Sequence, residues 1–246
     1  MTEPENELGW TYGRPARATR SLLQHLIVFP ILRMITPVVV RDGSAFVGLS
    51  NPVIVASNHV SHLDTPVVLR ALPRRIRSRL VVAAAKDYFY RSRLRGTLVS
   101  LSMATIPFDR GAGSKESLRR CESLIRDGWS LLIFPEGTRS PKGQLGRVRH
   151  GVAVLAVATQ VPVLPVFVHG LADVMPKGRV APLPGGVMVD VGDVLRPEQG
   201  EDVSTFRDRV EASLLRLSER RPEWGTEPPH IPSQDPDGSG DRFLPY

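Results

Sequence analysis

The chain has 246 residues, enough for one α/β domain with a sizeable core, and a formal net charge of +7. The charge is uneven, because residues 1–8 carry −3 and residues 223–246 carry −4, which leaves +14 on the residues between them. A field of that sign attracts nucleic acid, anionic lipid or phosphorylated substrates. The single cysteine, Cys121, excludes an intramolecular disulfide and a metal site built from cysteine alone.

The N-terminal part of the sequence divides into two segments. Residues 1–13 begin with acidic and polar side chains, lack the basic flank of a secretory signal and are predicted to be disordered. Residues 14–40 are basic and then apolar, and we expect either one helix over 21–36 or a pair of helices split near Pro30. Prolines and charges interrupt the segment too often for a spanning helix. Its pattern fits a helix lying in the membrane interface, and a helix packed on the domain is the alternative.

Residues 41–220 carry the pattern of an α/β domain. Short apolar runs alternate with stretches of helical periodicity, which predicts a mostly parallel sheet flanked by helices, preceded by the interfacial helical segment. Residues 221–246 are acidic and rich in proline and glycine, and they are predicted to be a disordered tail. The apolar runs are 53–56, 80–85, 104–107, 131–134 and 163–168, and a further strand is predicted over 187–191. The predicted helices are 66–72, 92–101, 114–127, 151–159 and 203–218.

Each of the five apolar runs ends at a polar, charged or turn cluster. Ligands of parallel sheets bind beyond the carboxyl ends of the strands, so these clusters are expected to build one site. The first cluster contains His59 and, five residues later, Asp64. Residues five apart do not meet on a regular helix, but Pro66 suits the first helical position, which leaves His59 in a preceding turn. A carboxylate on one imidazole nitrogen leaves the other nitrogen as a general base.

These motifs resemble those of the glycerolipid acyltransferase family, which includes lysophosphatidic acid acyltransferase. The resemblance rests on four motifs in the family's order. They are Asn58-His59 with Asp64, residues 106–110 (Ile-Pro-Phe-Asp-Arg), residues 134–140 (Phe-Pro-Glu-Gly-Thr-Arg-Ser) and residues 161–166 (Val-Pro-Val-Leu-Pro-Val). The match covers roughly residues 21–193, most of the chain expected to be ordered.

The resemblance implies a reaction and a role for each motif. His59 deprotonates the free hydroxyl of lysophosphatidic acid, which attacks the thioester of an acyl carrier, and Asp64 orients His59. The second and third motifs bind the glycerol phosphate, and an arginine fork suits a phosphate monoester. Glu136 is expected either to accept from glycerol hydroxyls or to hold an arginine. The substrate-binding set is Arg110, Glu136, Gly137, Thr138 and Arg139.

The partners follow from the same resemblance and from the charge. The acyl donor is acyl-CoA or acyl carrier protein, two acidic alternatives that the basic body attracts equally, and no metal or other cofactor is expected. An anionic membrane surface is an expected partner, with the protein peripheral or monotopic on the cytoplasmic face. Nucleic acid is not, because no aromatic platform or recognition motif accompanies the basic residues.

Two alternatives stay open at the level of sequence. The acceptor could be another lysolipid or a related alcohol. The chain could instead be a metal-dependent hydrolase that uses His59, His62 and Asp64 as ligands, although His150 and His169 look isolated in the sequence. His62 is also the rival general base within the first motif.

Overall fold

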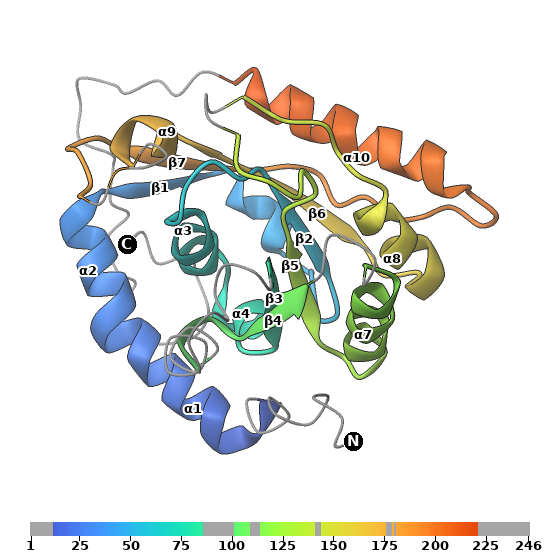
Figure 1. The fold of residues 1–246 in the computed structure, drawn as a ribbon, viewed down its shortest axis with the longest axis horizontal. Coiled ribbons are helices and arrows are strands. Elements are labelled where there is room, and N and C mark those ends of the chain that lie inside the picture. The colour runs from blue at the N-terminus through green and yellow to red at the C-terminus, as the bar shows by residue number, and fades with distance from the viewer. Residues whose placement is uncertain are drawn as a thin grey trace.

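The computed structural model describes residues 12–85, 101–108, 114–140, 144–175, 179 and 181–220. Within them a seven-stranded sheet is flanked by helices (Figure 1). The strands are β1 (Val38–Arg41), β2 (Ile54–Ser57), β3 (Leu80–Ala85), β4 (Thr105–Phe108), β5 (Ser130–Ile133), β6 (Val163–His169) and β7 (Val187–Val191). The helices are α1 (Arg14–Leu23), η3 (Gln24–Val28), α2 (Phe29–Ile35), η4 (Gly43–Phe46), α3 (Asp64–Ala71), α4 (Arg74–Arg77), α7 (Ser114–Arg126), α8 (Gly151–Thr159), α9 (Leu171–Val174) and α10 (Val203–Ser218).

The sheet has the strand order β1-β7-β6-β2-β5-β3-β4. The strands β6, β2, β5, β3 and β4 are parallel to one another, whereas β7 is antiparallel to β6 and β1 runs parallel to β7. The five apolar runs predicted from the sequence are these five parallel strands, so their carboxyl ends share one edge. The predicted fold class is confirmed.

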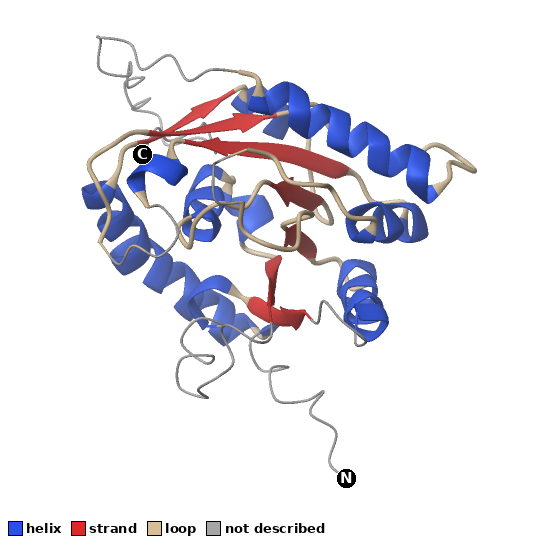
Figure 2. Ribbon diagram, turned by 45° about the horizontal axis from the view of Figure 1, so that its top comes forward, coloured by secondary structure: helices blue, strands red, loops and turns tan. Residues whose placement is uncertain are grey.

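Both faces of the sheet are covered by helices, as Figure 2 shows. Along β2 the residues alternate between two cores: Val55 packs in the core that contains α2, α3 and α4, and Ile54 in the core that contains α7, α8 and α10. A strand buried on both faces needs apolar residues at every position, which explains why the sequence shows continuous runs rather than alternation. This sandwich holds the strand ends rigidly in place.

The N-terminal helical segment starts earlier than expected and contains a π-helical turn before Pro30. It runs from Arg14 to Ile35, and its middle is the π-helical turn η3. Proline lacks an N–H and its ring crowds the carbonyl four residues earlier, and the wider turn before Pro30 relieves that conflict. No helix in the described part of the chain is both long and apolar enough to cross a bilayer.

The range 14–40 expected for this segment needs a correction at its C-terminal end. Val38–Arg41 form β1, an edge strand paired with β7, and the backbone is already extended at Thr36. Pro37 disfavours helical geometry in the residue before it, and the three valines that follow prefer a strand. The domain therefore begins inside the expected segment.

Most other predicted elements agree with the structure to within two residues, namely α3, α7, α8, α10 and β7. The helix predicted over 92–101 falls almost wholly outside the described residues, as do the two segments predicted to be disordered. Tyr12 is an exception, because its ring packs against Trp129 with the ring centroids 5.2 Å apart.

Candidate active site

Asn58 fixes the loop that leaves β2. Its side chain is fully buried, its Nδ2 donates to the carbonyl of Val168 at 3.0 Å, and its Oδ1 accepts from the amide of Val168 at 2.7 Å. The two bonds tie the carboxyl ends of β2 and β6 together, so His59 leaves the sheet edge from a rigid point. This role of Asn58 could not be predicted from local sequence, since its partner lies 110 residues away.

The two residues expected to form a dyad meet in the structure. Nδ1 of His59 lies 2.7 Å from Oδ2 of Asp64, and the amides of Val60 and Ser61 donate to the same oxygen at 2.7 and 2.8 Å. Asp64 is the first residue of α3 and is fully buried, and the chain between it and His59 turns back as predicted. The ring of His59 stacks on Phe134 with the centroids 4.3 Å apart. The imidazole is thereby held in one plane.

This geometry sets the chemistry of the imidazole. The carboxylate accepts a hydrogen bond from the protonated Nδ1. The lone pair is then on Nε2, which is the nitrogen that acts as the base. The side chain of His59 keeps 22% of its surface exposed, whereas that of Asp64 keeps none. A buried carboxylate also stabilises the imidazolium that forms when Nε2 takes a proton.

Glu136 joins the first and third motifs through backbone contacts. Its Oε1 accepts from the amide of His59 and its Oε2 from the amide of Gly146, both at 2.7 Å. The side chain is 5% exposed, and burial raises the pKa of Glu136 because the two amide bonds offset the loss of solvation only in part. A further bond runs from the amide of Ser140 to the carbonyl of His59 at 2.8 Å. Both oxygens of Glu136, expected to face substrate or an arginine, thus hold backbone.

Gly137 and Thr138 form the turn after Glu136. The amide of Gly137 donates to the carbonyl of Phe134 at 3.0 Å, and its φ of +72° favours glycine. A Cβ on Gly137 would lie 3.0 Å from Nε of Arg149, which donates to the carbonyl of Glu136 at 3.2 Å. Arg149, which none of the four motifs contains, thus packs on this turn. Thr138 is exposed beside it.

Arg139 and His62 pair at the same edge. Nη1 of Arg139 lies 2.7 Å from Nε2 of His62. Burial, and then the charges of Arg139 and His59, lower the pKa of His62, so its imidazole is neutral at pH 7 and accepts from the guanidinium. His62 is therefore occupied with an arginine and badly placed to serve as the base. Arg110, the other expected phosphate ligand, lies outside the described residues, and so do Lys86 and Asp109.

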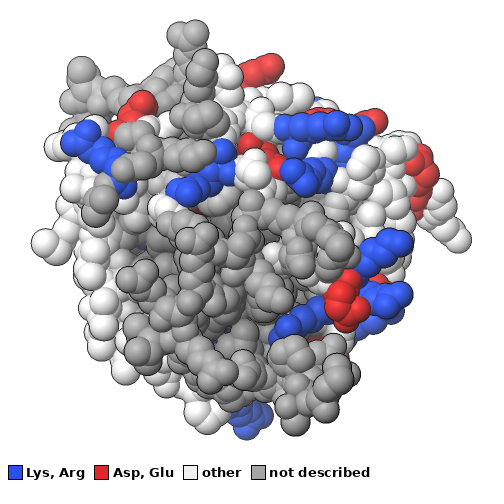
Figure 3. All heavy atoms as spheres, viewed as in Figure 1, with Lys and Arg blue, Asp and Glu red and all other residues white. Residues whose placement is uncertain are grey.

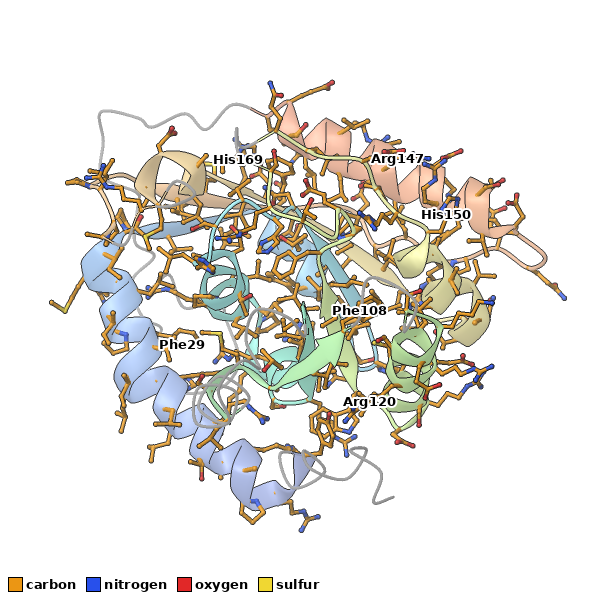
Figure 4. All side chains as sticks on the ribbon, viewed as in Figure 1. Phe29, Phe108, Arg120, Arg147, His150 and His169 are labelled. Carbon is orange, nitrogen blue, oxygen red and sulfur yellow. The ribbon has the colours of Figure 1, made fainter. Side chains whose placement is uncertain are left out.

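His169 is not isolated, contrary to the impression from the sequence. Its Nε2 lies 3.1 Å from Oδ2 of Asp190, whose carboxylate also accepts from Nε and Nη2 of Arg41 at 2.6 and 2.5 Å. Burial alone would raise the pKa of Asp190, but the bonds from His169 and Arg41 and the charge of Arg41 outweigh it and lower that pKa. Figure 4 places His169 near α9, away from Arg147 and His150 beside α8 and α10.

Metal ligation finds little support among the side chains that the structure describes. No group of three or more histidine, cysteine, aspartate or glutamate side chains there is arranged to hold an ion. In addition, His62 faces the cationic Arg139, and a cation beside a ligand opposes the binding of another.

The structure thus defines an α/β protein whose carboxyl strand edge carries a histidine–carboxylate dyad next to an arginine. Residues 37–169 match the model of the Acyltransferase family, and because that match covers more than half of the chain, the chain belongs to this family.

Named relatives come from plants, bacteria and animals. The chain is 32% identical over 129 residues to the chloroplastic 1-acyl-sn-glycerol-3-phosphate acyltransferase BAT2 of Brassica napus, covering 52% of this chain and 36% of that one. It is 33% identical over 113 residues to the 1-acyl-sn-glycerol-3-phosphate acyltransferase of Pseudomonas aeruginosa, covering 46% and 40%. The match thus spans between a third and two fifths of the length of these relatives.

A solved structure shares the fold. The 1-acyl-sn-glycerophosphate acyltransferase PlsC of Thermotoga maritima superposes with a TM-score of 0.62, at 23% identity, over 89% of this chain and 83% of that one. At that identity the likeness concerns the fold alone.

Proposed function

We propose that the protein transfers a fatty acyl group from a thioester to the free hydroxyl of lysophosphatidic acid, giving phosphatidic acid and a free thiol. The contact of 2.7 Å between His59 and Asp64 at the carboxyl edge of the sheet carries the proposal. The names of the relatives support this acceptor. The donor is acyl-CoA or acyl carrier protein, and no metal or other cofactor takes part.

The dyad performs general-base catalysis. Nε2 of His59 takes the proton of the acceptor hydroxyl as its oxygen forms a bond to the thioester carbonyl carbon. The tetrahedral intermediate then collapses, the carbon–sulfur bond breaks, and the imidazolium returns the proton to the departing sulfur. Asp64 keeps His59 in one tautomer and stabilises its charged form. The protein needs no covalent intermediate for this sequence.

Two arginines bind the phosphate group of lysophosphatidic acid. Arg139 is oriented by His62 at the edge where His59 lies, and Arg110 supplies a second cation from the second motif. Glu136 acts as a positioning residue, because its two bonds to backbone amides fix both the His59 loop and the chain at Gly146. Because both oxygens of Glu136 are bonded to these amides, its negative charge does not face the phosphate of the substrate.

The substrates place the reaction at a membrane surface. Leu22, Leu26, Ile31 and Met34 of the N-terminal helical segment expose between 51% and 87% of their surface, which is costly in water and favourable in the bilayer interface. We place the protein on the cytoplasmic face, held by this segment and by the attraction of its basic body to anionic lipid.

Acyl transfer from long-chain acyl-CoA to lysophosphatidic acid in vesicles containing EDTA tests this function. The expected result is activity in the parent protein and a loss of ~10²-fold or more in kcat for His59→Ala. His150→Ala, which removes an exposed histidine outside the dyad, is the matched control and should stay within about two-fold. A parent protein that is active without EDTA and inactive with it would favour the metal-dependent alternative. Equal activity of His59→Ala and the parent would rule out the dyad.

A further variant separates the two histidines of the first motif. His62→Ala removes the acceptor that orients Arg139 and leaves the dyad intact. We expect it to raise the KM for lysophosphatidic acid more than it lowers kcat. The reverse split would make His62 the base. An inactive parent would call for acyl carrier protein as donor and other lysolipids as acceptors.

A further inference from the structure

A cleft lined by arginines lies between α1 and α4 and has a volume of about 220 Å³. We call it the arginine cleft, and it is defined by Arg14, Arg17, Arg20, Arg74 and Arg77. Its place in the fold separates it from the dyad. The helix α4 leads into the start of β3 (Figure 1), and α1 is bonded to Leu101 just before β4. The cleft between these two helices therefore lies at the amino edge of the sheet. The dyad lies at the carboxyl edge.

The positive charge of the cleft is not balanced by the surrounding sequence. No aspartate or glutamate occurs in residues 8–41 or in residues 65–86, the two stretches that supply its lining. Arg14, Arg17 and Arg74 form no ion pair with any carboxylate that the structure describes, and neither does Arg77. Like charges gathered without a counterion repel one another, which destabilises the fold unless an anion joins them.

Two of the arginines are fixed in place before any ligand arrives. Nη1 of Arg77 donates to the carbonyls of Leu69 and Leu72, each at 3.0 Å, and its guanidinium lies 4.9 Å from the ring centroid of Phe29. Nε of Arg20 donates to the carbonyl of Leu101 at 3.1 Å. Their side chains therefore lose little conformational freedom when an anion binds.

Burial makes these cations more receptive to an anion. It lowers the pKa of Arg20 and of Arg77 to about 10, and the neighbouring charges of Arg17 and Arg74 act in the same direction. Both groups remain protonated at neutral pH. In addition, Nε of Arg17 is buried and has no hydrogen-bond partner within the described residues, and a buried N–H without a partner is costly.

An exposed apolar stripe continues from the cleft along the same helical segment. It consists of Leu22, Leu26, Ile31 and Met34, spaced by four, five and three residues. The step of five spans the π-helical turn, where five residues approach one turn, so the side chains stay on one face. Ala18, which lines the cleft, lies one turn before Leu22. An anion-binding cleft beside an exposed apolar stripe matches the two halves of a phospholipid.

We propose that the arginine cleft binds the phosphate group of an anionic membrane phospholipid while the apolar stripe enters the bilayer interface. Arginine forks suit phosphate oxygens, and the occupant is a lipid rather than a free phosphate because the stripe supplies apolar contact next to the cleft. The binding is separate from acyl transfer, takes place at the opposite edge of the sheet and requires no acyl donor.

Sedimentation with vesicles tests the proposal on the full chain. Vesicles of phosphatidylcholine, with and without phosphatidylglycerol, are compared at about 0.15 M salt. The test variant is Arg17→Gln with Arg74→Gln, which changes one half-buried and one exposed side chain. The control with the same loss of charge is Arg119→Gln with Arg216→Gln, on α7 and α10. A third variant, Arg17→Lys with Arg74→Lys, keeps the charge and removes the planar forks.

We expect the glutamine pair in the cleft to weaken binding to phosphatidylglycerol vesicles by about ten-fold or more, and the control pair by less than about three-fold. The lysine pair should also weaken binding, since a point charge replaces a fork. Equal effects of the two glutamine pairs, or full binding by the lysine pair, would reduce the attraction to general charge and overturn the proposal. Complete displacement of the parent from vesicles by millimolar inorganic phosphate would make free phosphate the ligand and overturn the assignment to lipid. Thermal melts of all variants exclude unfolding as the cause.

Discussion

One oxygen of Asp64 accepts three hydrogen bonds, from Nδ1 of His59 and from the amides of Val60 and Ser61. Its other oxygen, Oδ1, is buried without a hydrogen-bond partner within the described residues. An asparagine can therefore keep its carbonyl oxygen in the position of Oδ2, which accepts the three bonds, and place its amide nitrogen in the position of Oδ1. Asp64→Asn preserves the shape of the dyad and removes its charge.

We expect Asp64→Asn to lower kcat by about 10²- to 10⁴-fold with little change in the KM for lysophosphatidic acid, because the imidazolium loses its counter-charge. Steady-state kinetics measure the split, and a thermal melt shows whether the protein remains folded. A rise in KM at constant kcat would mean that Asp64 serves binding, and the role assigned to the dyad would be wrong.

Between elements, the contact of Glu136 with Gly146 leaves no room for a side chain. A Cβ at Gly146 would lie 2.5 Å from Oε2 of Glu136, so the carboxylate would have to move and release its hold on the amide of His59. We expect Gly146→Ala to destabilise the protein by about 1–3 kcal/mol and to lower kcat as the His59 loop loosens. Urea unfolding and kinetics of acyl transfer check the two effects.

The matched control for that variant is Gly151→Ala. A Cβ at Gly151 would meet only Leu118 at an ordinary 3.7 Å, and the position is the first residue of α8, where alanine is a better helix former. It should leave activity unchanged and stability unchanged or raised by up to about 1 kcal/mol. If both variants behaved alike, the contact between Glu136 and Gly146 would have no special importance.

Three strands are joined by the carboxylate of Asp190, which lies on β7 and bonds Arg41 of β1 and His169 of β6. Asp190→Asn removes the negative charge that pairs with the partly buried guanidinium of Arg41, and we expect a loss of about 3 kcal/mol in the free energy of unfolding. Asp193→Asn, at an exposed position two residues beyond the end of β7, should change stability by less than about 0.5 kcal/mol.

The difference in stability between the parent and Asp190→Asn is expected to depend on pH. The folded-state pKa of Asp190 is lowered from the ordinary 3.8, so its contribution is present above about that pH and is lost as the pH falls through the folded value. The gap in stability between the parent and Asp190→Asn should therefore shrink on acidification below pH ~4. A gap that stayed constant or widened in acid would show that the carboxylate is not the stabilising group.

The elements that local pattern determines were predicted well from the sequence. The five parallel strands and the helices α7, α8 and α10 follow from apolar runs and from helical periodicity, which are properties of short windows. β1 was missed because its valines continue an apolar helical segment, and only the pairing with β7, almost 150 residues later, makes them a strand. A tertiary contact decided the outcome there.

The candidate site divides in the same way. Proximity of His59 and Asp64 was predicted because Pro66 indicated a helix that starts only after His59, and α3 does start at Asp64, with a turn before it. The pairing of Asn58 with Val168, of Glu136 with Gly146 and of His169 with Asp190 could not be read from residue types, since each joins segments whose neighbourhood only the folded sheet creates.

Across the whole molecule, the charge is divided between a basic body and acidic ends. Figure 3 shows lysine and arginine side chains gathered in several groups on one face, with fewer acidic ones among them. Residues 223–246 carry −4, and removing them takes the net charge from +7 to +11. Because these acidic residues are covalently joined to the basic body, they compete with anionic lipid for its positive charge.

Truncation after residue 222 is therefore expected to tighten binding to phosphatidylglycerol vesicles by about three-fold or more at low ionic strength, because about 1 kcal/mol per charge is at stake near the surface. Neutralising Glu223, Glu227, Asp235, Asp237 and Asp241 in the full chain, which gives +12, keeps the length and should have the same effect. Both gains should vanish near ~1 M salt, where charges more than about 3 Å apart are screened. A gain in the truncated protein alone, or one that persists in high salt, would assign the effect to exclusion by the tail rather than to its charge.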